Sequence, residues 1–293
     1  MYTRKQRNSI KYIYLKTVDG DRYMNLNDFK KFESLFCNSN PTFVFDYNCL
    51  EHPHIFEMIE YLIDKFRHFV VRCDKCRHID IYESKRKMIP DFRVKIDPKL
   101  SLERIAREIN NNTMLYNYIK DLNKDYLFDY SIDLYVNKSN IHYLKQTIKT
   151  LTHDNFKSRV LFEEYAHNGF YNLGAKKSST IDKYDIDTNL LMKDIVEDRE
   201  LMIVNRENII KMLDNYMCFM CWKYDYAIQI CLNSDFKLQL CNKINYEINL
   251  NPLECFDSDG QLKEDIWTKF QDEYKKCCFG CTCEDFVNEA IRE

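Results

Sequence analysis

Hydrophobic residues recur at the spacing of a helical face along much of the chain. The clearest case begins at Ile55, from which apolar side chains recur about every third or fourth position as far as Val70. Such a stripe predicts a helix over 55–70 whose apolar face is buried. The same kind of reading predicts further helices at 28–36, 101–122, 141–151, 156–167, 262–278 and 283–291.

Two short segments near the start have the character of strands. Residues 10–16 and 22–26 flank Asp19 and Gly20, a pair that supplies the positive backbone angles of a tight turn. We therefore expect a β-hairpin there, and the apolar run over 42–47 predicts one more strand.

The C-terminal part of the chain favours helix throughout. Residues 210–231 place apolar side chains three and four positions apart in alternation, which predicts a helix packed against another helix. A segment rich in Gly, Ser and charge, 168–187, predicts a linker or loop between an N-terminal lobe, 1–167, and a C-terminal lobe, 188–293. The predicted fold is predominantly α-helical, with a short N-terminal β-hairpin, few other strands and an all-helical, Cys-rich C-terminal lobe.

Composition narrows the class of protein. The chain has 293 residues, 45% of them hydrophobic and 30% charged, which indicates a folded protein and not a disordered one. A net charge of -3 gives no basic surface for specific nucleic-acid binding. No apolar run approaches the roughly 18 residues that span a bilayer, so no membrane contact is expected. The first residues lack the apolar stretch of a secretory signal, and we expect the chain to begin in the cytosol or nucleus.

Charge is distributed unevenly between the two ends. Residues 1–23 carry six Lys or Arg against two Asp, whereas residues 254–293 carry eleven Asp or Glu against five Lys or Arg. Two solvated surfaces would account for this, but complementary ends also suit contacts between copies of the chain. On the second interpretation Arg4, Lys5 and Arg7 are candidate charge contacts between copies.

Thirteen cysteines are the most unusual feature of the composition, and four of them, Cys277, Cys278, Cys281 and Cys283, lie within seven residues. Adjacent cysteines do not easily bond to each other, which makes these four candidates for disulfides between copies. A zinc site is the alternative. His68, Cys73, Cys76 and His78 have the spacing of a zinc set, but Cys73 continues the apolar stripe and Cys76 lies one turn on, which favours core thiols. Cys218 and Cys221 fall in the middle of the predicted helix over 210–231, which argues against a redox pair. No metal ligand is assigned. No catalytic motif and no phosphate-binding Gly loop occurs, and we expect neither an enzyme nor a cofactor.

The head, MYTRKQR, and the tail, CCFGCTC, together with the Tyr, Cys and Asn bias, resemble an insect-virus occlusion-body protein, the polyhedrin of an AT-rich nudivirus. The resemblance implies a structural protein that crystallises in infected cells, encases virions and dissolves in alkali. Its partners would then be further copies of itself and virion components, and its location the host nucleus and later the extracellular crystal. The resemblance implies no catalytic residues.

Alkaline dissolution has a physical basis in the composition, because Cys, Tyr and Lys all titrate in strong alkali and would leave the chain highly negative. The alternative function is a zinc-binding viral regulatory or nucleic-acid-associated factor that uses the cysteine clusters. Disulfide connectivity, lattice symmetry, the building-block oligomer and exchange of a terminus between copies stay open at this point.

Overall fold

The computed structural model divides the chain into two compact units. Unit 1 comprises Met1–Phe92, Asn117–Asp129 and Cys221–Cys277, and unit 2 comprises Arg93–Tyr116, Tyr130–Met220 and Cys278–Glu293. The structure describes residues 10–73, 91–96, 130–153, 156–162, 165–166, 181–182, 186–215, 229–239, 247–248 and 250–277. Strand β6 (Asp91–Ile96) lies where the chain passes from one unit to the other.

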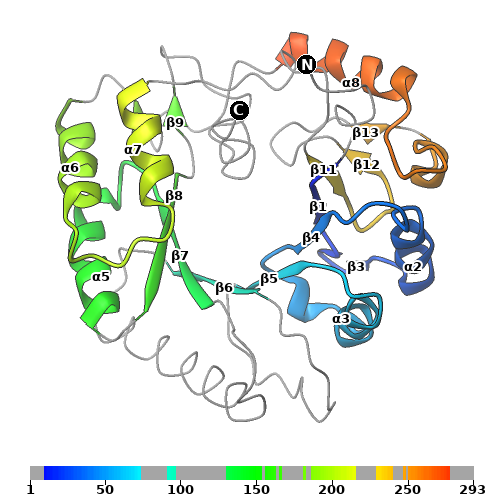
Figure 1. Ribbon diagram of the computed structural model, residues 1–293, viewed down its shortest axis with the longest axis horizontal. Helices are drawn as coiled ribbons and strands as arrows, with labels where there is room; N and C mark the ends of the chain where they lie inside the picture. The colour runs from blue at the N-terminus through cyan, green and yellow to red at the C-terminus, as the bar shows by residue number, and fades with distance from the viewer. Residues whose placement is uncertain are drawn as a thin grey trace. The chain divides into compact units, whose positions relative to one another are not determined.

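Unit 1 is built on a mostly parallel β-sheet (Figure 1). Its strands are β1 (Tyr12–Leu15), β4 (Thr42–Phe45), β5 (Phe69–Cys73), β11 (Gln229–Leu232), β12 (Leu238–Gln239) and β13 (Glu247–Ile248). Their order is β13-β12-β11-β1-β4-β5, in which β11, β1, β4 and β5 run parallel while β12 and β13 run antiparallel to their neighbours. Parallel neighbours need crossover connections, which explains why helices follow β1 and β4.

Helices α2 (Leu26–Ser34) and α3 (Ile55–Asp64) cover one face of this sheet (Figure 1). Phe29 of α2 lies between Phe43 and Phe45 of β4, with ring centroids 6.4 Å apart in both pairs. The Phe32 ring makes edge contacts with the rings of Phe36 and Phe256. These rings are almost completely buried, so their packing supplies much of the hydrophobic stabilisation of unit 1.

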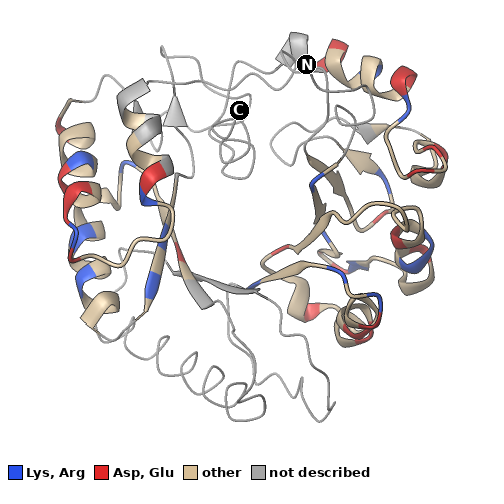
Figure 2. Ribbon diagram, viewed as in Figure 1, with Lys and Arg blue, Asp and Glu red and all other residues tan. Residues whose placement is uncertain are grey.

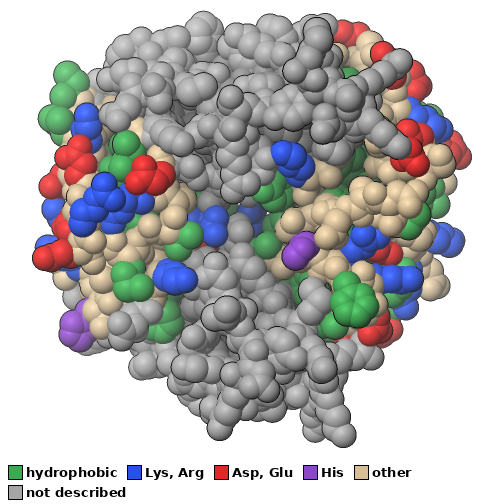
Figure 3. All heavy atoms as spheres, in the orientation of Figure 1, with side chains coloured by type: hydrophobic (Ala, Val, Ile, Leu, Met, Phe, Trp, Pro, Cys, Tyr) green, Lys and Arg blue, Asp and Glu red, His purple; other side chains and the backbone are tan. Residues whose placement is uncertain are grey.

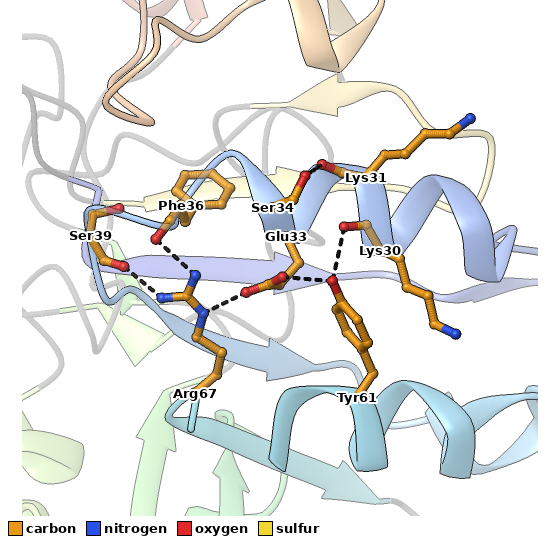
Figure 4. A network of polar contacts seen from close by, with 8 residues as sticks. All are labelled: Lys30, Lys31, Glu33, Ser34, Phe36, Ser39, Tyr61 and Arg67. Carbon is orange, nitrogen blue, oxygen red and sulfur yellow. Dashed lines mark hydrogen bonds and ion pairs between the residues drawn. The ribbon is translucent and has the colours of Figure 1, made fainter. Parts of the chain in front are cut away.

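A buried ion pair ties α2 to the segment that leads into β5 (Figure 4). The Arg67 guanidinium donates to Glu33 Oε1 at 2.5 Å and to the carbonyl oxygens of Ser39 and Phe36. Tyr61 of α3 donates to the other Glu33 oxygen at 3.0 Å. The network therefore satisfies a buried carboxylate from two sides and fixes both helices relative to the start of β5.

Two short helical turns and one longer helix complete the described part of unit 1. They are η1 (Cys49–Glu51), η3 (Pro252–Glu254) and α8 (Glu264–Cys277). Gly260, in the turn before α8, has φ +73°, and a Cβ built there would lie 2.5 Å from the Leu35 carbonyl oxygen. Only glycine meets both demands at this position.

Unit 2 places the parallel strands β7 (Tyr130–Val136) and β8 (Lys157–Phe162) side by side, joined through α5 (Ile141–His153). Helices α6 (Ile186–Glu197) and α7 (Arg206–Asn215) follow, and β9 (Tyr165–Ala166) pairs with β10 (Ile181–Asp182). The Asn205 side chain bonds both backbone groups of Val160 at 3.0 and 2.8 Å. This amide makes the two hydrogen bonds that the backbone of a neighbouring strand would make, and it links the start of α7 to β8.

The surface described by the structure is mixed. Residues of both charges lie along α2 and α6 (Figure 2), and hydrophobic side chains appear among charged ones in separate patches (Figure 3). Single exposed apolar residues are ordinary on a folded protein. No helix within the described ranges has the length and apolarity to cross a membrane.

The prediction of a predominantly helical fold is wrong, because the protein is a mixed α/β structure with a parallel-rich sheet. Strands buried on both faces are uniformly apolar, so their pattern does not differ from that of a buried helix. The helix predicted over 55–70 is shorter in the structure, because α3 ends at Asp64. Phe66, two residues later, has φ 54°, and the last part of the apolar stripe belongs to β5. The predicted helix over 156–167 is likewise replaced by β8 and β9.

The C-terminal lobe is not all-helical either. The predicted helix over 210–231 begins within α7, but its last residues form β11, where Cys231 pairs with Tyr14 of β1. The N-terminal hairpin exists in reduced form as β2 (Val18–Asp19) and β3 (Arg22–Tyr23), while β1 joins the large sheet instead. The predicted helix over 101–122 lies outside the described residues, and the boundary predicted at 168–187 stays a prediction.

Candidate functional site

Four polar residues stand in a row where the parallel strands of unit 1 end. Register pairs Leu15 with both Phe45 and Leu232, and Phe45 with Val71. The next position on each strand is polar, and the row runs Asn233, Lys16, Asp46, Arg72 across β11, β1, β4 and β5. Carboxyl ends of parallel strands are the edge at which open α/β sheets bind ligands. We name these four residues the carboxyl-edge row.

The row lies on the sheet face opposite to the helices. Side chains alternate along a strand, and Leu15 and Phe45, the neighbours of Lys16 and Asp46, are fully buried on the helix-covered side. The electrostatics of Cys231 agree with this placement. The pKa of its thiol is raised to about 12, mainly by burial and in part by the Asp46 carboxylate, while the Lys16 ammonium opposes the shift. Lys16, Asp46 and Cys231 are therefore neighbours in space, although more than 180 positions separate Asp46 from Cys231.

Arg72 is a buried cation held between aromatic rings. Its guanidinium carbon lies 5.2 Å from the centre of the Tyr14 ring and 5.7 Å from that of Tyr47, and only 8% of the residue is exposed. A desolvated cation over aromatic faces gains from the quadrupole of each ring. Asp46 Oδ1 accepts the backbone N–H of Tyr47 at 2.7 Å, which positions one ring of the pair.

Two buried oxygen atoms next to the row have no hydrogen-bond partner among the described residues, namely Thr17 Oγ1 and Asn48 Oδ1. Thr17 directly follows Lys16 and is fully buried. Asn48 lies against the same segment, because its Nδ2 donates to the Val18 carbonyl oxygen at 3.3 Å. Buried polar atoms are almost always paired in folded proteins, so these two oxygens are hydrogen-bond acceptors available beside the row.

The β2–β3 hairpin is fixed over this edge from two neighbouring loops. Arg22 donates to Asp235, which follows β11, at 2.7 Å. The His52 ring lies 2.8 Å from the Met24 carbonyl oxygen, and its Nδ1 accepts the backbone N–H of His54 at 3.0 Å. Burial lowers the pKa of His52, which favours the neutral ring that this pair of contacts requires.

Unit 2 has a polar pair of its own. Asp133 of β7 and Arg159 of β8 are register partners, with Nε and Oδ1 3.7 Å apart and both side chains buried. Such a pair can serve the specificity of packing without serving chemistry.

The residues predicted from the sequence as contacts between copies are not in this site. Arg4, Lys5, Arg7, Cys278, Cys281 and Cys283 lie outside the described residues, and Cys277 is the last residue of α8, with its side chain also outside them. Their roles stay predictions. The sequence patterns above do not predict the carboxyl-edge row. The available signal is that each of its members directly follows, or ends, an apolar run.

No family model matches the chain, and no curated protein matches it either. Solved structures do. The crystal structure of Streptococcus suis SuiB aligns with a TM-score of 0.59 at 11% identity, covering 98% of this chain and 75% of that chain. Native anSMEcpe with bound AdoMet and Kp18Cys peptide aligns with a TM-score of 0.57 at 13% identity, covering 94% and 91%. SuiB bound to S-adenosylmethionine gives 0.58 at 10% identity, covering 99% and 76%.

The chain thus shares the α/β fold of SuiB and anSMEcpe, which other structures show with bound S-adenosylmethionine or AdoMet and with peptides. At these identities the likeness concerns the fold alone. It overturns the resemblance to a nudivirus polyhedrin, and with it the predictions of a non-enzymatic structural protein and of self-assembly into a virion-encasing lattice. The zinc-binding alternative has no support, and the described residues include no group of His, Cys, Asp or Glu suited to hold a metal ion. The predicted nuclear location stays a prediction.

Proposed function

We propose that this protein is an enzyme that binds S-adenosylmethionine at the carboxyl-edge row of unit 1 and acts on a peptide. The observation that carries the proposal is the row itself, which lines up Lys16, Asp46 and Arg72 at the ligand-binding edge of a parallel sheet. Support for the ligand and substrate comes from the structural neighbours. One is described with bound AdoMet and a peptide, and SuiB is described bound to the precursor peptide SuiA.

The chemistry of the row suits this ligand. The methionine part of S-adenosylmethionine carries a carboxylate and an ammonium group, which are complementary to Lys16 and Asp46. Its sulfonium and adenine groups favour aromatic faces, which Tyr14 and Tyr47 provide beside Arg72. Lys16 is half exposed and contacts Asp19 of the hairpin at 3.3 Å, so its ammonium group can turn to a ligand without unfolding the sheet.

Equilibrium dialysis with radiolabelled S-adenosylmethionine tests the proposal. Lys16→Met and Asp46→Asn should each weaken binding by about tenfold or more, because each removes one charge-assisted contact. Asn at position 46 keeps an oxygen that accepts the Tyr47 N–H, which protects the local fold.

Matched controls come from the same unit. Lys11 is exposed before the amino end of β1, and Asp64 is exposed at the end of α3. Lys11→Met and Asp64→Asn should bind as the unmodified protein does. Absence of binding by the unmodified protein, or equal loss in the control variants, would refute the proposed site.

A further inference from the structure

The fold class implies a cofactor that the carboxyl edge does not accommodate. Radical chemistry on S-adenosylmethionine goes together with an iron–sulfur cluster, and such clusters are held by several Cys thiolates. A cluster that acts on a ligand at the carboxyl-edge row needs thiols in the loops around that row. The structure describes three of these loops, residues 16–25 after β1, 46–54 after β4 and 233–237 after β11. The loop after β5, which contains Cys76, lies outside the described residues.

The loop after β1 contains no cysteine and is held by contacts on both sides. It forms the β2–β3 hairpin, in which Thr17, Val18 and Met24 are buried to 1% exposure or less. Asp235 holds one side of the hairpin through Arg22, and Asn48 and His52 hold the other. The space that cluster ligands would need is therefore filled by a closed, hydrogen-bonded element.

The nearby thiols are also unsuited to the task. Cys49 follows β4 but is fully buried, and its Sγ donates to the Arg72 carbonyl oxygen at 3.4 Å. Cys231 lies within β11, where burial holds its thiol protonated, whereas metals bind the thiolate. Cys255 is buried elsewhere, against the Asn251 carbonyl oxygen. Among the described residues no three metal-binding side chains converge.

We infer that the carboxyl edge of unit 1 is built without an iron–sulfur cluster, and that Lys16 and Asp46 take over the positioning of the ligand there. The second half of this inference rests on the proposed function, whereas the first half rests only on the hairpin and the thiols. It distinguishes this chain from what its fold class implies.

Anaerobic reconstitution of the full chain with ferrous iron and sulfide, followed by gel filtration, tests the inference. We expect iron well below one cluster per chain, no visible absorption of a cluster, and S-adenosylmethionine affinity unchanged by the treatment. A stoichiometric [4Fe–4S] cluster that survives gel filtration and persists when Cys277, Cys278, Cys281 and Cys283 are changed to Ser would overturn it. Ligand binding that appears only after reconstitution would overturn it as well.

Cysteine variants keep the outcomes distinct. Any retained iron should disappear from the variant with Cys277, Cys278, Cys281 and Cys283 changed to Ser, with ligand affinity unaltered, because none of those four residues belongs to the row. Iron that persists there but is lost in Cys49→Ser, or in a variant with Cys73 and Cys76 changed to Ser, would place a cluster at the edge and refute the inference. Failure to bind S-adenosylmethionine with no iron retained would refute the proposed function while leaving the cluster-free edge standing.

Discussion

Removal of Arg67 should be among the most destabilising single changes in unit 1. In Arg67→Met the Glu33 carboxylate, whose side chain is 1% exposed, keeps only the Tyr61 hydroxyl as a side-chain donor. The Ser39 carbonyl oxygen loses its Arg67 donor as well, whereas that of Phe36 keeps the backbone N–H of Ser39 at 3.1 Å. Breaking a buried ion pair from one side typically costs roughly 3–5 kcal/mol, a large part of the roughly 5–15 kcal/mol that stabilises a domain.

Urea unfolding followed by circular dichroism measures this loss. Lys31→Met is the matched control, because Lys31 pairs with Asp28 on the same helix at 3.6 Å but both side chains are well exposed, and such pairs contribute about 0.5 kcal/mol or less. The double variant Glu33→Met, Arg67→Met should recover part of the loss, since it leaves no buried charge unpaired. A loss in Arg67→Met no larger than in Lys31→Met would refute the reasoning.

Three further predictions follow from single contacts. Gly260→Ala should lower the free energy of unfolding by more than Gly20→Ala, since both positions have positive φ but only at Gly260 does the new Cβ meet a backbone oxygen; equal losses in urea unfolding would contradict this. Iodoacetamide should alkylate exposed Cys37 in the folded protein and spare Cys231, as peptide mass spectrometry can read out, and modification of both at the same rate would be inconsistent with the burial described. Because the folded pKa of His52 is lowered from 6.5, its contribution to stability is present above pH 6.5 and falls as the pH drops below it; His52→Gln should flatten this dependence of the urea midpoint, and an unchanged profile would argue against it.

Sequence patterns located several elements but not their partners. The strand at β4 and the helices α5 and α8 are confirmed close to their predicted bounds, because each has a clear start signal and a consistent apolar period. The turn at Gly20 is also confirmed, with φ +61°. The strands β5, β8 and β11 begin or lie where the pattern predicts helix, since short buried strands carry uniform apolar runs that periodicity does not distinguish from helix.

The candidate site is harder to predict from the sequence than the helices and strands are. Lys16, Asp46, Arg72 and Asn233 become neighbours only through the register of four parallel strands, and β1 and β11 are separated by more than 200 positions. No spacing rule within the sequence relates such residues. Local spacing is the signal that a single sequence provides most readily, and it points to the cysteine clusters instead.

A crystal structure of the protein soaked with S-adenosylmethionine tests the central claim most directly. The account predicts ligand density at the carboxyl edge of the unit 1 sheet, with the methionine carboxylate near Lys16, the ammonium group near Asp46, and no iron–sulfur cluster beside them. Density for the ligand at another place, or a cluster bound at this edge, would contradict it.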